Sequence, residues 1–236
     1  MNLILISPQD FINENNIVRL AGRRHRHILE VLKAKVGDEL CVGLINEKMG
    51  TGCVLSIDDK SLTLEIGRTS NPPKALPLTL ILALPRPQVI KRVLQCASSL
   101  GVKKIILLNF FRVEKSLWQS SSLKEDAIHE QLILGLEQAK DTVLPEVILR
   151  KRFKDFADDE LPGLIKGALP LVAHPGAVDA CPCGIKQPVT LLIGPEGGLI
   201  DDELQKLKGL GFRAIDLGSR ILKVESVLPF VVGKLF

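Results

Sequence analysis

The sequence predicts an α/β domain with a parallel sheet, preceded by a small β-barrel. In the first part of the chain, short runs of alternating apolar and polar residues are separated by Gly, Asp and Asn turns, which is typical of strands joined by tight turns. Further on, continuous apolar runs alternate with segments of helical spacing, as in a parallel sheet covered by helices. Asn71-Pro72-Pro73-Lys74 has the composition of a linker. We therefore expect one domain over residues 1–72 and a second over residues 73–236.

The first domain is expected to contain several strands and one helix. The clearest strands lie at residues 39–44, 52–57 and 62–66. A helix near residues 24–34 interrupts the strand pattern, with Ile28, Val31 and Leu32 on its apolar face. The turn at Gly37-Asp38 marks its end. One helix among short strands favours a small barrel.

The second domain begins with Leu78–Leu84, a continuous apolar run typical of a strand buried on both faces. Residues 88–100 have helical spacing and stop at Gly101. Ser122-Leu123-Lys124-Glu125 fits a capping box that opens a helix to about Lys140. The other expected elements are strands at 105–108, 146–149, 169–173, 189–193 and 213–217, a helix at 201–209 and a closing segment at 223–235.

The composition is that of a globular protein of the cytoplasm. Of 236 residues, 46% are hydrophobic and 25% charged, which argues against disorder. Apolar runs stay well short of the ~18–20 residues of a membrane helix, so we expect no membrane association. The opening residues lack the basic region and cleavage site of a signal peptide. Five cysteines are too few and too scattered for a disulfide framework, which favours a reducing compartment.

The net charge of +4 is too small to indicate nucleic acid, but the positive charge is concentrated in two segments. Residues 19–35 hold six Lys or Arg against Glu30 alone, and residues 85–115 hold seven against Glu114 alone. Such islands can contact phosphates, although a solvated helix face is the alternative for either one. The absence of Tyr and the shortage of other aromatics favour recognition by phosphate and shape over base stacking. The candidate RNA contacts are Arg23, Arg24, Arg26, His27, Lys33, Arg86, Lys91 and Arg92.

Two motifs contain the histidines or cysteines that a metal site needs, but each is better explained by another role. His25 and His27 lie among arginines and are read as RNA contacts, because a second pair of ligands is not nearby. Cys181-Pro182-Cys183 with His174 resembles a ligand cluster, but free thiols in a loop are the preferred interpretation. We therefore expect no metal. Trp118 is interpreted as a packing anchor, with stacking on RNA as the alternative.

The most informative segment is a glycine-rich loop after a buried strand. Residues 189–193 lead into Gly194-Pro195-Glu196-Gly197-Gly198, and a helix follows with Asp201-Asp202-Glu203 in its first turn. Loops at the carboxyl ends of parallel strands bind ligands. The spacing fits neither a dinucleotide fingerprint nor a phosphate-binding P-loop, and the acids would repel a polyphosphate. A ligand with little negative charge is favoured over NAD or ATP, and a purely structural turn is the alternative.

A second turn of the same kind follows the last predicted strand. It runs Leu217-Gly218-Ser219-Arg220-Ile221-Leu222-Lys223-Val224-Glu225 and opens the closing segment with charged residues. Alone, this turn is also compatible with a structural role.

Together the two turns resemble those of the SPOUT methyltransferases, and more specifically of the RsmE family of 16S ribosomal RNA uridine methyltransferases. The similarity spans nearly the whole chain. It is carried by the two turns and Asp202-Glu203, and also by residues 27–33, Gly37-Asp38, Leu100-Gly101-Val102, Glu137-Gln138-Ala139 and Ala173-His174-Pro175.

The resemblance implies a PUA-like N-terminal barrel and a SPOUT-type α/β domain tied in a trefoil knot. It further implies a homodimer, S-adenosyl-L-methionine as cofactor, and methylation of N3 of one uridine in small-subunit rRNA, within naked RNA or the 30S particle. The chain departs from the family at Lys223 and Ser226, where an Arg and a Thr are common, and at Pro85-Arg86-Pro87, where many members have a lysine-containing turn.

The resemblance also assigns the site residues. Those expected to bind the cofactor are His174, Gly194, Pro195, Glu196, Gly197, Gly198, Leu217, Gly218, Ile221 and Leu222. Arg220 is expected to stabilise negative charge that develops on the uridine. Glu225 is expected to orient Arg220, with a role as general base as the alternative. An ion pair of Arg220 with Glu196 or Glu225 is the structural alternative. Lys223 is added to the RNA contacts.

Two other functions compete with this reading. A non-enzymatic RNA-binding assembly factor could keep the fold, and a SPOUT methyltransferase could act on a different RNA position. A nucleotide-dependent enzyme is disfavoured, because the lysine of a phosphate loop is missing.

Overall fold

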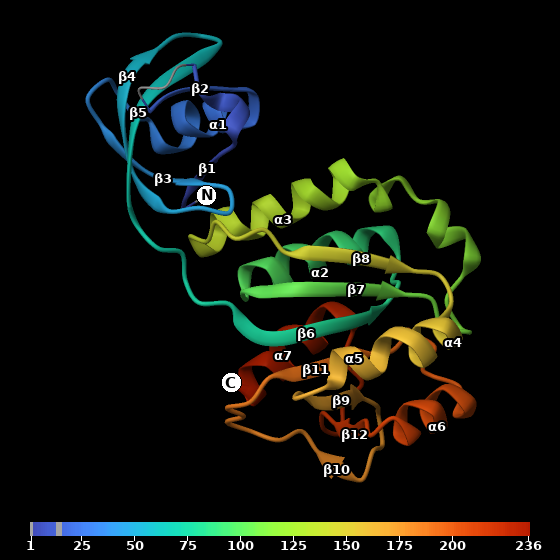
Figure 1. Ribbon diagram of the computed structural model, residues 1–236. Coiled ribbons are helices and arrows are strands. Elements are labelled where there is room, and N and C mark those ends of the chain that lie inside the picture. The colour runs from blue at the N-terminus through green and yellow to red at the C-terminus, as the bar shows by residue number, and fades with distance from the viewer. Residues whose placement is uncertain (1, 13–15) are drawn as a thin grey trace. The chain divides into compact units, whose positions relative to one another are not determined.

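A computed structural model describes residues 2–12 and 16–236 (Figure 1). The chain divides into two compact units. The first contains the residues up to Lys74 together with Ile133–Leu144, and the second contains Ala75–Leu132 and Pro145–Phe236. The linker composition of residues 71–74 thus coincides with the end of the first segment of the first unit.

The first unit is built on a curled five-stranded sheet with the order β1-β3-β4-β5-β2 (Figure 1). β1 pairs with β3 in parallel, and the other neighbours are antiparallel. Its apolar core includes Ile28, Val42 and Leu64. The strands are β1 (Ile4–Ile6), β2 (Ile17–Ala21), β3 (Glu39–Leu44), β4 (Met49–Ile57) and β5 (Ser61–Ser70).

The predicted helix of the first unit is present but differs in its ends and its buried face. It consists of α1 (Gly22–His27) and a π-helical turn over Ile28–Leu32, and Lys33 ends it in the left-handed conformation at φ 52°. Ile28 is buried as expected, whereas Val31 and Leu32 are 63% and 42% exposed. The predicted apolar face was therefore wrong at these two positions, which lie in the π-helical turn, where the spacing of side chains differs from the α-helical spacing used in the prediction.

The second unit contains a seven-stranded sheet with the order β10-β12-β9-β11-β6-β7-β8, and every neighbouring pair is parallel. The predicted parallel α/β sheet is confirmed. Leu80, Ile81 and Leu82 in the middle of the sheet are fully buried, which explains the continuous apolar run. The strands are β6 (Leu76–Ala83), β7 (Val102–Leu108), β8 (Glu146–Arg150), β9 (Leu169–Ala173), β10 (Asp179–Ala180), β11 (Val189–Ile193) and β12 (Arg213–Asp216).

The helices agree with the periodic segments of the sequence, with one addition at residues 153–165. The C-terminal helix packs against the first helix of the second unit. Helices of the described chain are too short or too polar to cross a membrane. The helices after α1 are α2 (Pro87–Ser99), α3 (Glu125–Ala139), α4 (Phe153–Asp155), α5 (Leu161–Ile165), α6 (Asp201–Gly209) and α7 (Val224–Leu235), with a π-helical turn at Phe156–Glu160.

The start of α3 corrects the predicted capping box. Ser122 lies within a separate 3-10 turn, Ser121–Leu123, and the helix begins at Glu125. The hydroxyl of Ser120 accepts the Ser122 N–H at 3.2 Å. Serine thus caps a turn here, as its side chain favours, but one turn earlier than the sequence indicated.

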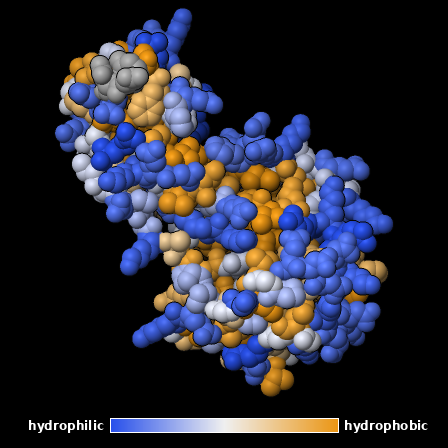
Figure 2. Space-filling model, in the orientation of Figure 1, coloured by the Kyte–Doolittle hydropathy of each residue, from blue (hydrophilic) through white to orange (hydrophobic). Residues whose placement is uncertain are grey.

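Parallel pairing places four strand ends at one edge of the second sheet. Ile193 at the end of β11 is level with Leu82 of β6 and with Ala173 of β9, and Ile215 of β12 is level with Ala173. The loops that follow these strands therefore converge on one region. Figure 2 shows hydrophilic residues surrounding a hydrophobic area on the visible face of the second unit.

Candidate functional site

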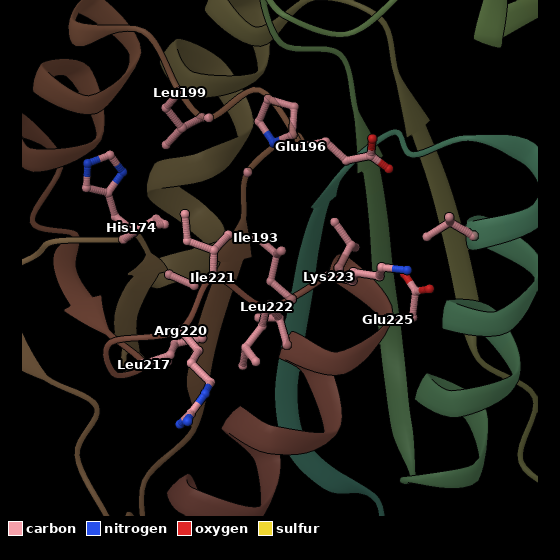
Figure 3. A pocket seen from close by; sticks show the side chains of 18 of the residues that line it. His174, Ile193, Glu196, Leu199, Leu217, Arg220, Ile221, Leu222, Lys223 and Glu225 are labelled. Carbon is pink, nitrogen blue, oxygen red and sulfur yellow. The ribbon is translucent and has the colours of Figure 1, made fainter.

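A cavity of about 1240 Å³ lies at the carboxyl ends of β6, β9, β11 and β12 (Figure 3). Its walls come from the segments that follow these strands and from the N-terminal halves of α2 and α7. The two glycine-rich turns singled out in the sequence both line it. This is the edge at which open parallel sheets bind ligands.

The loop after β11 is fixed by a buried carboxylate. Glu203 accepts the Ile200 N–H at 3.1 Å with one oxygen and the Phe111 N–H at 2.8 Å with the other. Its side chain is buried, whereas Asp201 and Asp202 are exposed. Glu203 is therefore a structural residue of the loop and is turned away from any ligand in the cavity. Gly198 adopts φ 77°, a conformation that favours glycine.

The loop after β12 is tied to the loop after β9 by Asp216. Its carboxylate accepts the Gly218 N–H at 2.9 Å and the Gly176 N–H at 3.1 Å. Gly218 adopts φ 113°, which explains why glycine follows this strand. Sequence reasoning missed the role of Asp216. The available signal was an acid at the end of a strand, immediately before a loop that needs its N–H groups satisfied.

Apolar side chains form much of the cavity wall. In Figure 3, Ile193, Ile221 and Leu222 lie in the middle of the view, with His174 and Leu199 on one side and Glu196 and Glu225 on the other. Ile221 is largely exposed, so an apolar surface faces the cavity mouth. Nine of the ten predicted cofactor residues line the cavity, namely His174, Gly194, Pro195, Glu196, Gly198, Leu217, Gly218, Ile221 and Leu222. The tenth, Gly197, lines a smaller adjoining hollow.

The two predicted catalytic residues both line the cavity but do not contact one another. Glu225 forms an ion pair with Arg92 of α2, and Glu196 lies 3.9 Å from Arg86. Arg220 is exposed, its guanidinium points away from Glu196 and Glu225 in Figure 3, and it has no ion pair with the residues that the structure describes. Neither the ion pairs considered for Arg220 nor its orientation by Glu225 is therefore present here.

Three of the predicted RNA contacts, Arg86, Arg92 and Lys223, line the same cavity as the predicted catalytic residue Arg220. Lys223, like Arg220, lacks a carboxylate partner among the described residues. Lys91 is exposed on α2 outside the cavity wall. The cavity thus presents two unpaired cations beside apolar and carboxylate groups.

The predicted RNA contacts of the first unit fall into two groups. Arg23 forms two hydrogen bonds with Glu137, at 2.8 and 2.9 Å, and Arg24 forms two with Asp10, each at 2.7 Å. Arg26 and Lys33 are exposed. The first two arginines thus hold the fold together, and the second pair is available to a partner.

The two histidines of α1 are directed inward. His25 is buried, and its Nε2 lies 2.9 Å from the carbonyl oxygen of Asp58. The expectation that His25 contacts RNA was therefore wrong, because this apolar-facing histidine is satisfied within the unit. His27 is partly buried, and its Nε2 has no hydrogen-bond partner among the described residues.

The cysteine motif and Trp118 take structural positions. Cys181 is buried, which raises the pKa of its thiol, and Cys183 is exposed. Across the described ranges, His, Cys, Asp and Glu side chains form no group of three or more able to hold a metal. The indole N–H of Trp118 donates to Asn109 at 2.8 Å, as suits a packing anchor.

Comparison with curated proteins reveals relatives that match nearly the whole chain. The ribosomal RNA small subunit methyltransferase E of Treponema pallidum is 29% identical over 231 residues, which cover 96% of this chain and 87% of that protein. The ribosomal RNA small subunit methyltransferase E 1 of Borreliella burgdorferi is 27% identical over 230 residues, covering 96% and 93%.

Solved structures share the fold. A methyltransferase of Legionella pneumophila, in complex with the bound cofactor SAM, has a TM-score of 0.76 and 23% identity, covering 98% of this chain and 96% of that one. Ribosomal RNA small subunit methyltransferase E of Neisseria gonorrhoeae, bound to S-adenosyl methionine, has a TM-score of 0.74 and 21% identity, covering 98% and 95%.

A sequence model of the RNA methyltransferase domain matches residues 72–235. This range holds the whole parallel sheet, both glycine-rich turns and every residue that lines the cavity. It is well over half of the chain, and the chain belongs to the RNA methyltransferase domain family.

Proposed function

We propose that this protein transfers a methyl group from S-adenosyl-L-methionine to N3 of one uridine in 16S ribosomal RNA. The observation that carries the proposal is that the residues matched by the RNA methyltransferase domain family include every residue that lines the cavity. The domain match covers residues 72–235, and the two relatives above, named for methylation of small-subunit ribosomal RNA, extend over 96% of the chain.

The cavity fits this cofactor by its chemistry. A sulfonium carries positive charge, and the wall offers it the carboxylates of Glu196 and Glu225, beside apolar side chains and the cations described above. The described walls lack the lysine-bearing P-loop that a polyphosphate would require. When bound, S-adenosylmethionine supplies an electrophilic methyl group. We assign its binding to the two glycine-rich turns and to His174, which form one continuous part of the wall.

The chain's own contribution is to position the uridine and to stabilise charge on it. N3 of uridine becomes nucleophilic when it loses its proton, and negative charge then spreads to the neighbouring carbonyl oxygens. Arg220 is permanently ionised, planar and free of a described carboxylate partner, so its donors are available to those oxygens. Glu225, held by Arg92, is the candidate base and fixes the start of α7 behind the loop that carries Arg220.

RNA would be held by exposed cations on both units. Arg26 and Lys33 belong to the first unit, and Lys91, Arg86 and Lys223 belong to the second. Because each phosphate contact releases a counterion, we expect RNA affinity to fall steeply with salt.

The finer architecture completes the proposal. We infer that the curled sheet of the first unit is a PUA-like RNA-binding barrel and that the second unit carries a trefoil knot. After β12 the chain runs through residues 217–223 and ends in α7, which packs against α2. Because α2 follows β6, and β11 lies between β9 and β6 in the strand order, the chain crosses from one side of β11 to the other. This path supports a knot. We further infer a homodimer that acts in the cytoplasm, on the 30S particle or its RNA.

The proposal is tested by calorimetry with S-adenosylmethionine and by transfer of a labelled methyl group to small-subunit RNA. We expect binding of the cofactor and transfer to one uridine, in naked RNA or in 30S particles. Cofactor binding without transfer to either substrate would exclude the proposed target. Failure to bind the cofactor would favour the non-enzymatic assembly factor.

A further inference from the structure

A second hollow of about 170 Å³ adjoins the cavity and is not used by the proposed reaction. Arg86 and Glu196 line both spaces and therefore stand between them. The outer wall of the hollow is the segment after β7, which includes Arg112, Glu114 and Leu117. This segment belongs to neither glycine-rich turn.

The segment is fixed to the cavity wall at two points. The Phe111 N–H donates to the buried carboxylate of Glu203 at 2.8 Å, and the Arg112 guanidinium donates to the Gly197 carbonyl. The aliphatic part of Arg112 also packs on Gly197, because a Cβ added there would come within 3.3 Å of the Arg112 Cδ. The backbone of Phe111 and Arg112 is thus held in place before any ligand arrives.

From this anchored backbone the ring of Phe111 projects outward and is 76% exposed. The preceding residue, Phe110, is buried and packs on Phe153 with 5.0 Å between the ring centroids. Phe111 is the most exposed aromatic residue of the described ranges. One exposed ring is ordinary on a protein surface, so its significance depends on what lies beside it.

The next residue in the chain, Arg112, carries a guanidinium with unused donors. The bond to Gly197 occupies one N–H of Arg112, and no carboxylate of the described chain pairs with it. Among the described residues, the carboxylate that contacts Arg86 is Glu196, and this exposed contact of 3.9 Å is weak in water. Because Glu114 and Glu196 line the hollow itself, an anion is expected at the outer side of Arg112 and not within the hollow.

An exposed ring and a guanidinium without a carboxylate partner, on two consecutive residues of an anchored segment, can together recognise an unstacked nucleotide. The base stacks on the ring, and the phosphate accepts hydrogen bonds from the guanidinium. A protein partner would also cover a phenyl ring, but the cations at Arg86 and Arg112 favour an anionic ligand.

We propose that Phe111 and Arg112 form a subsite for the nucleotide next to the methylated uridine, whose base stacks on Phe111 and whose phosphate binds Arg112. The inference rests on the proposed function, because the neighbouring cavity is taken to hold the target uridine. It also revises the expectation of recognition without stacking: the chain has few aromatic residues, but one is exposed directly before Arg112, which lines the hollow beside the cavity.

The ring is tested with Phe111→Ala, Phe111→Leu and Phe111→Trp, using fluorescein-labelled single-stranded oligouridine and no cofactor. We expect Phe111→Ala and Phe111→Leu to weaken binding by about five- to a hundredfold and Phe111→Trp to retain it. Leucine keeps apolar bulk but no π face, so wild-type affinity of Phe111→Leu would overturn stacking. Calorimetry with S-adenosylmethionine, expected to be unchanged, reports whether each variant is folded.

The phosphate contact is tested with Arg112→Lys, which keeps the charge and can still reach the Gly197 carbonyl, and Arg112→Ala. We expect Arg112→Ala to raise the KM for RNA and to lower the salt slope of oligouridine binding by about one, with Arg112→Lys intermediate. Because Arg112 also binds the Gly197 carbonyl, cofactor affinity is measured for each variant, and the salt slope, which that contact does not set, reports the phosphate contact. Lys208→Ala on α6 is the matched control, since Lys208 is exposed and lies outside both cavity walls.

Two outcomes would overturn the subsite: unchanged oligouridine affinity in both Phe111→Ala and Arg112→Ala, or a change in oligomeric state of Phe111→Ala without any loss of RNA affinity. Oligouridine binding does not require methyl transfer. A wild-type protein that methylates no ribosomal RNA would therefore refute the proposed function separately from these binding results.

Discussion

The carboxylate of Glu225, in the first turn of α7, lies 3.4 Å from the guanidinium of Arg92 in the middle of α2. The two residues are 133 positions apart in the chain and both line the cavity. Their contact therefore links α2 to the start of α7, directly after the loop that carries Arg220 and Lys223.

Loss of this ion pair should impair the reaction more than it impairs folding. Because Arg92 is largely exposed, Glu225→Gln is expected to lower the free energy of unfolding by less than about 1 kcal/mol. Methyl transfer should fall further, since the loop before α7 loses its anchor. The measurements are urea unfolding and kcat for labelled methyl transfer.

The exchanged pair, Arg92→Glu with Glu225→Arg, separates the two roles of Glu225. Partial recovery of kcat would indicate a positioning residue, whereas continued inactivity would indicate that the carboxylate itself handles a proton. Full activity of Glu225→Gln would contradict both roles.

Arg220 is expected to act on the charge of the substrate and not on the cofactor. Removing one preorganised donor to a developing anion lowers kcat by about a hundred- to a thousandfold, so Arg220→Ala should do the same while its affinity for S-adenosylmethionine stays near wild type. Arg220→Lys keeps a cation without the planar pair of donors and should recover only part of the rate. Near-normal turnover of Arg220→Ala would remove this residue from the mechanism.

Arg23 and Arg26 are neighbours on α1 with opposite expected roles. The side chain of Glu137 is 2% exposed, and Arg23, which is 40% exposed, supplies both of its side-chain hydrogen bonds. Arg23→Ala leaves a buried carboxylate unpaired and should cost about 3 kcal/mol of unfolding free energy. Arg26→Ala should leave stability unchanged and weaken RNA binding.

Thermal unfolding and RNA titration of the two variants check this contrast. A stable Arg23→Ala protein with weakened RNA binding would instead make Arg23 an RNA contact, as the sequence suggested.

Asp10 is expected to make the first unit sensitive to acid. Burial on its own raises the pKa of Asp10, but hydrogen bonds from Arg24 and Ser7 outweigh burial, so the pKa lies below its ordinary value. The stabilisation is therefore fully present above about pH 4 and is lost as the pH falls through the lower folded-state pKa. Asp10→Asn should be less stable at neutral pH and should lose less stability on acidification. Parallel loss in both proteins, measured by urea unfolding against pH, would exclude this role.

Local sequence patterns predicted most of the second unit, because its strands and helices have strong and distinct periodicities. The run Leu78–Leu84 and the glycine loop after Ile193 could be read directly, since burial on both faces and a loop at a strand end leave clear signatures. β1 was not predicted individually. It pairs in parallel with β3, from which residues 7–38 separate it in the sequence, so no tight turn marks the pairing.

The parts of the site that depend on distant pairing were beyond the sequence. Arg24 and Arg26 are the same residue type in the same basic segment, so the sequence does not distinguish them. In the fold Arg24 pairs with Asp10, whereas Arg26 is exposed. Asp216 and Glu203 accept hydrogen bonds from backbone N–H groups of other loops. Those loops are adjacent because of the order of the strands in the sheet. The acids after the glycine loop were read as facing a ligand, and for Glu203 the fold turns the carboxylate inward.

Mapping of modified nucleotides in small-subunit ribosomal RNA, from cells with and without this protein, tests the central claim most directly. We predict that one N3-methyluridine disappears without the protein, returns with the wild-type chain and does not return with Arg220→Ala. A modification profile that is unchanged by removal of the protein would contradict the claim.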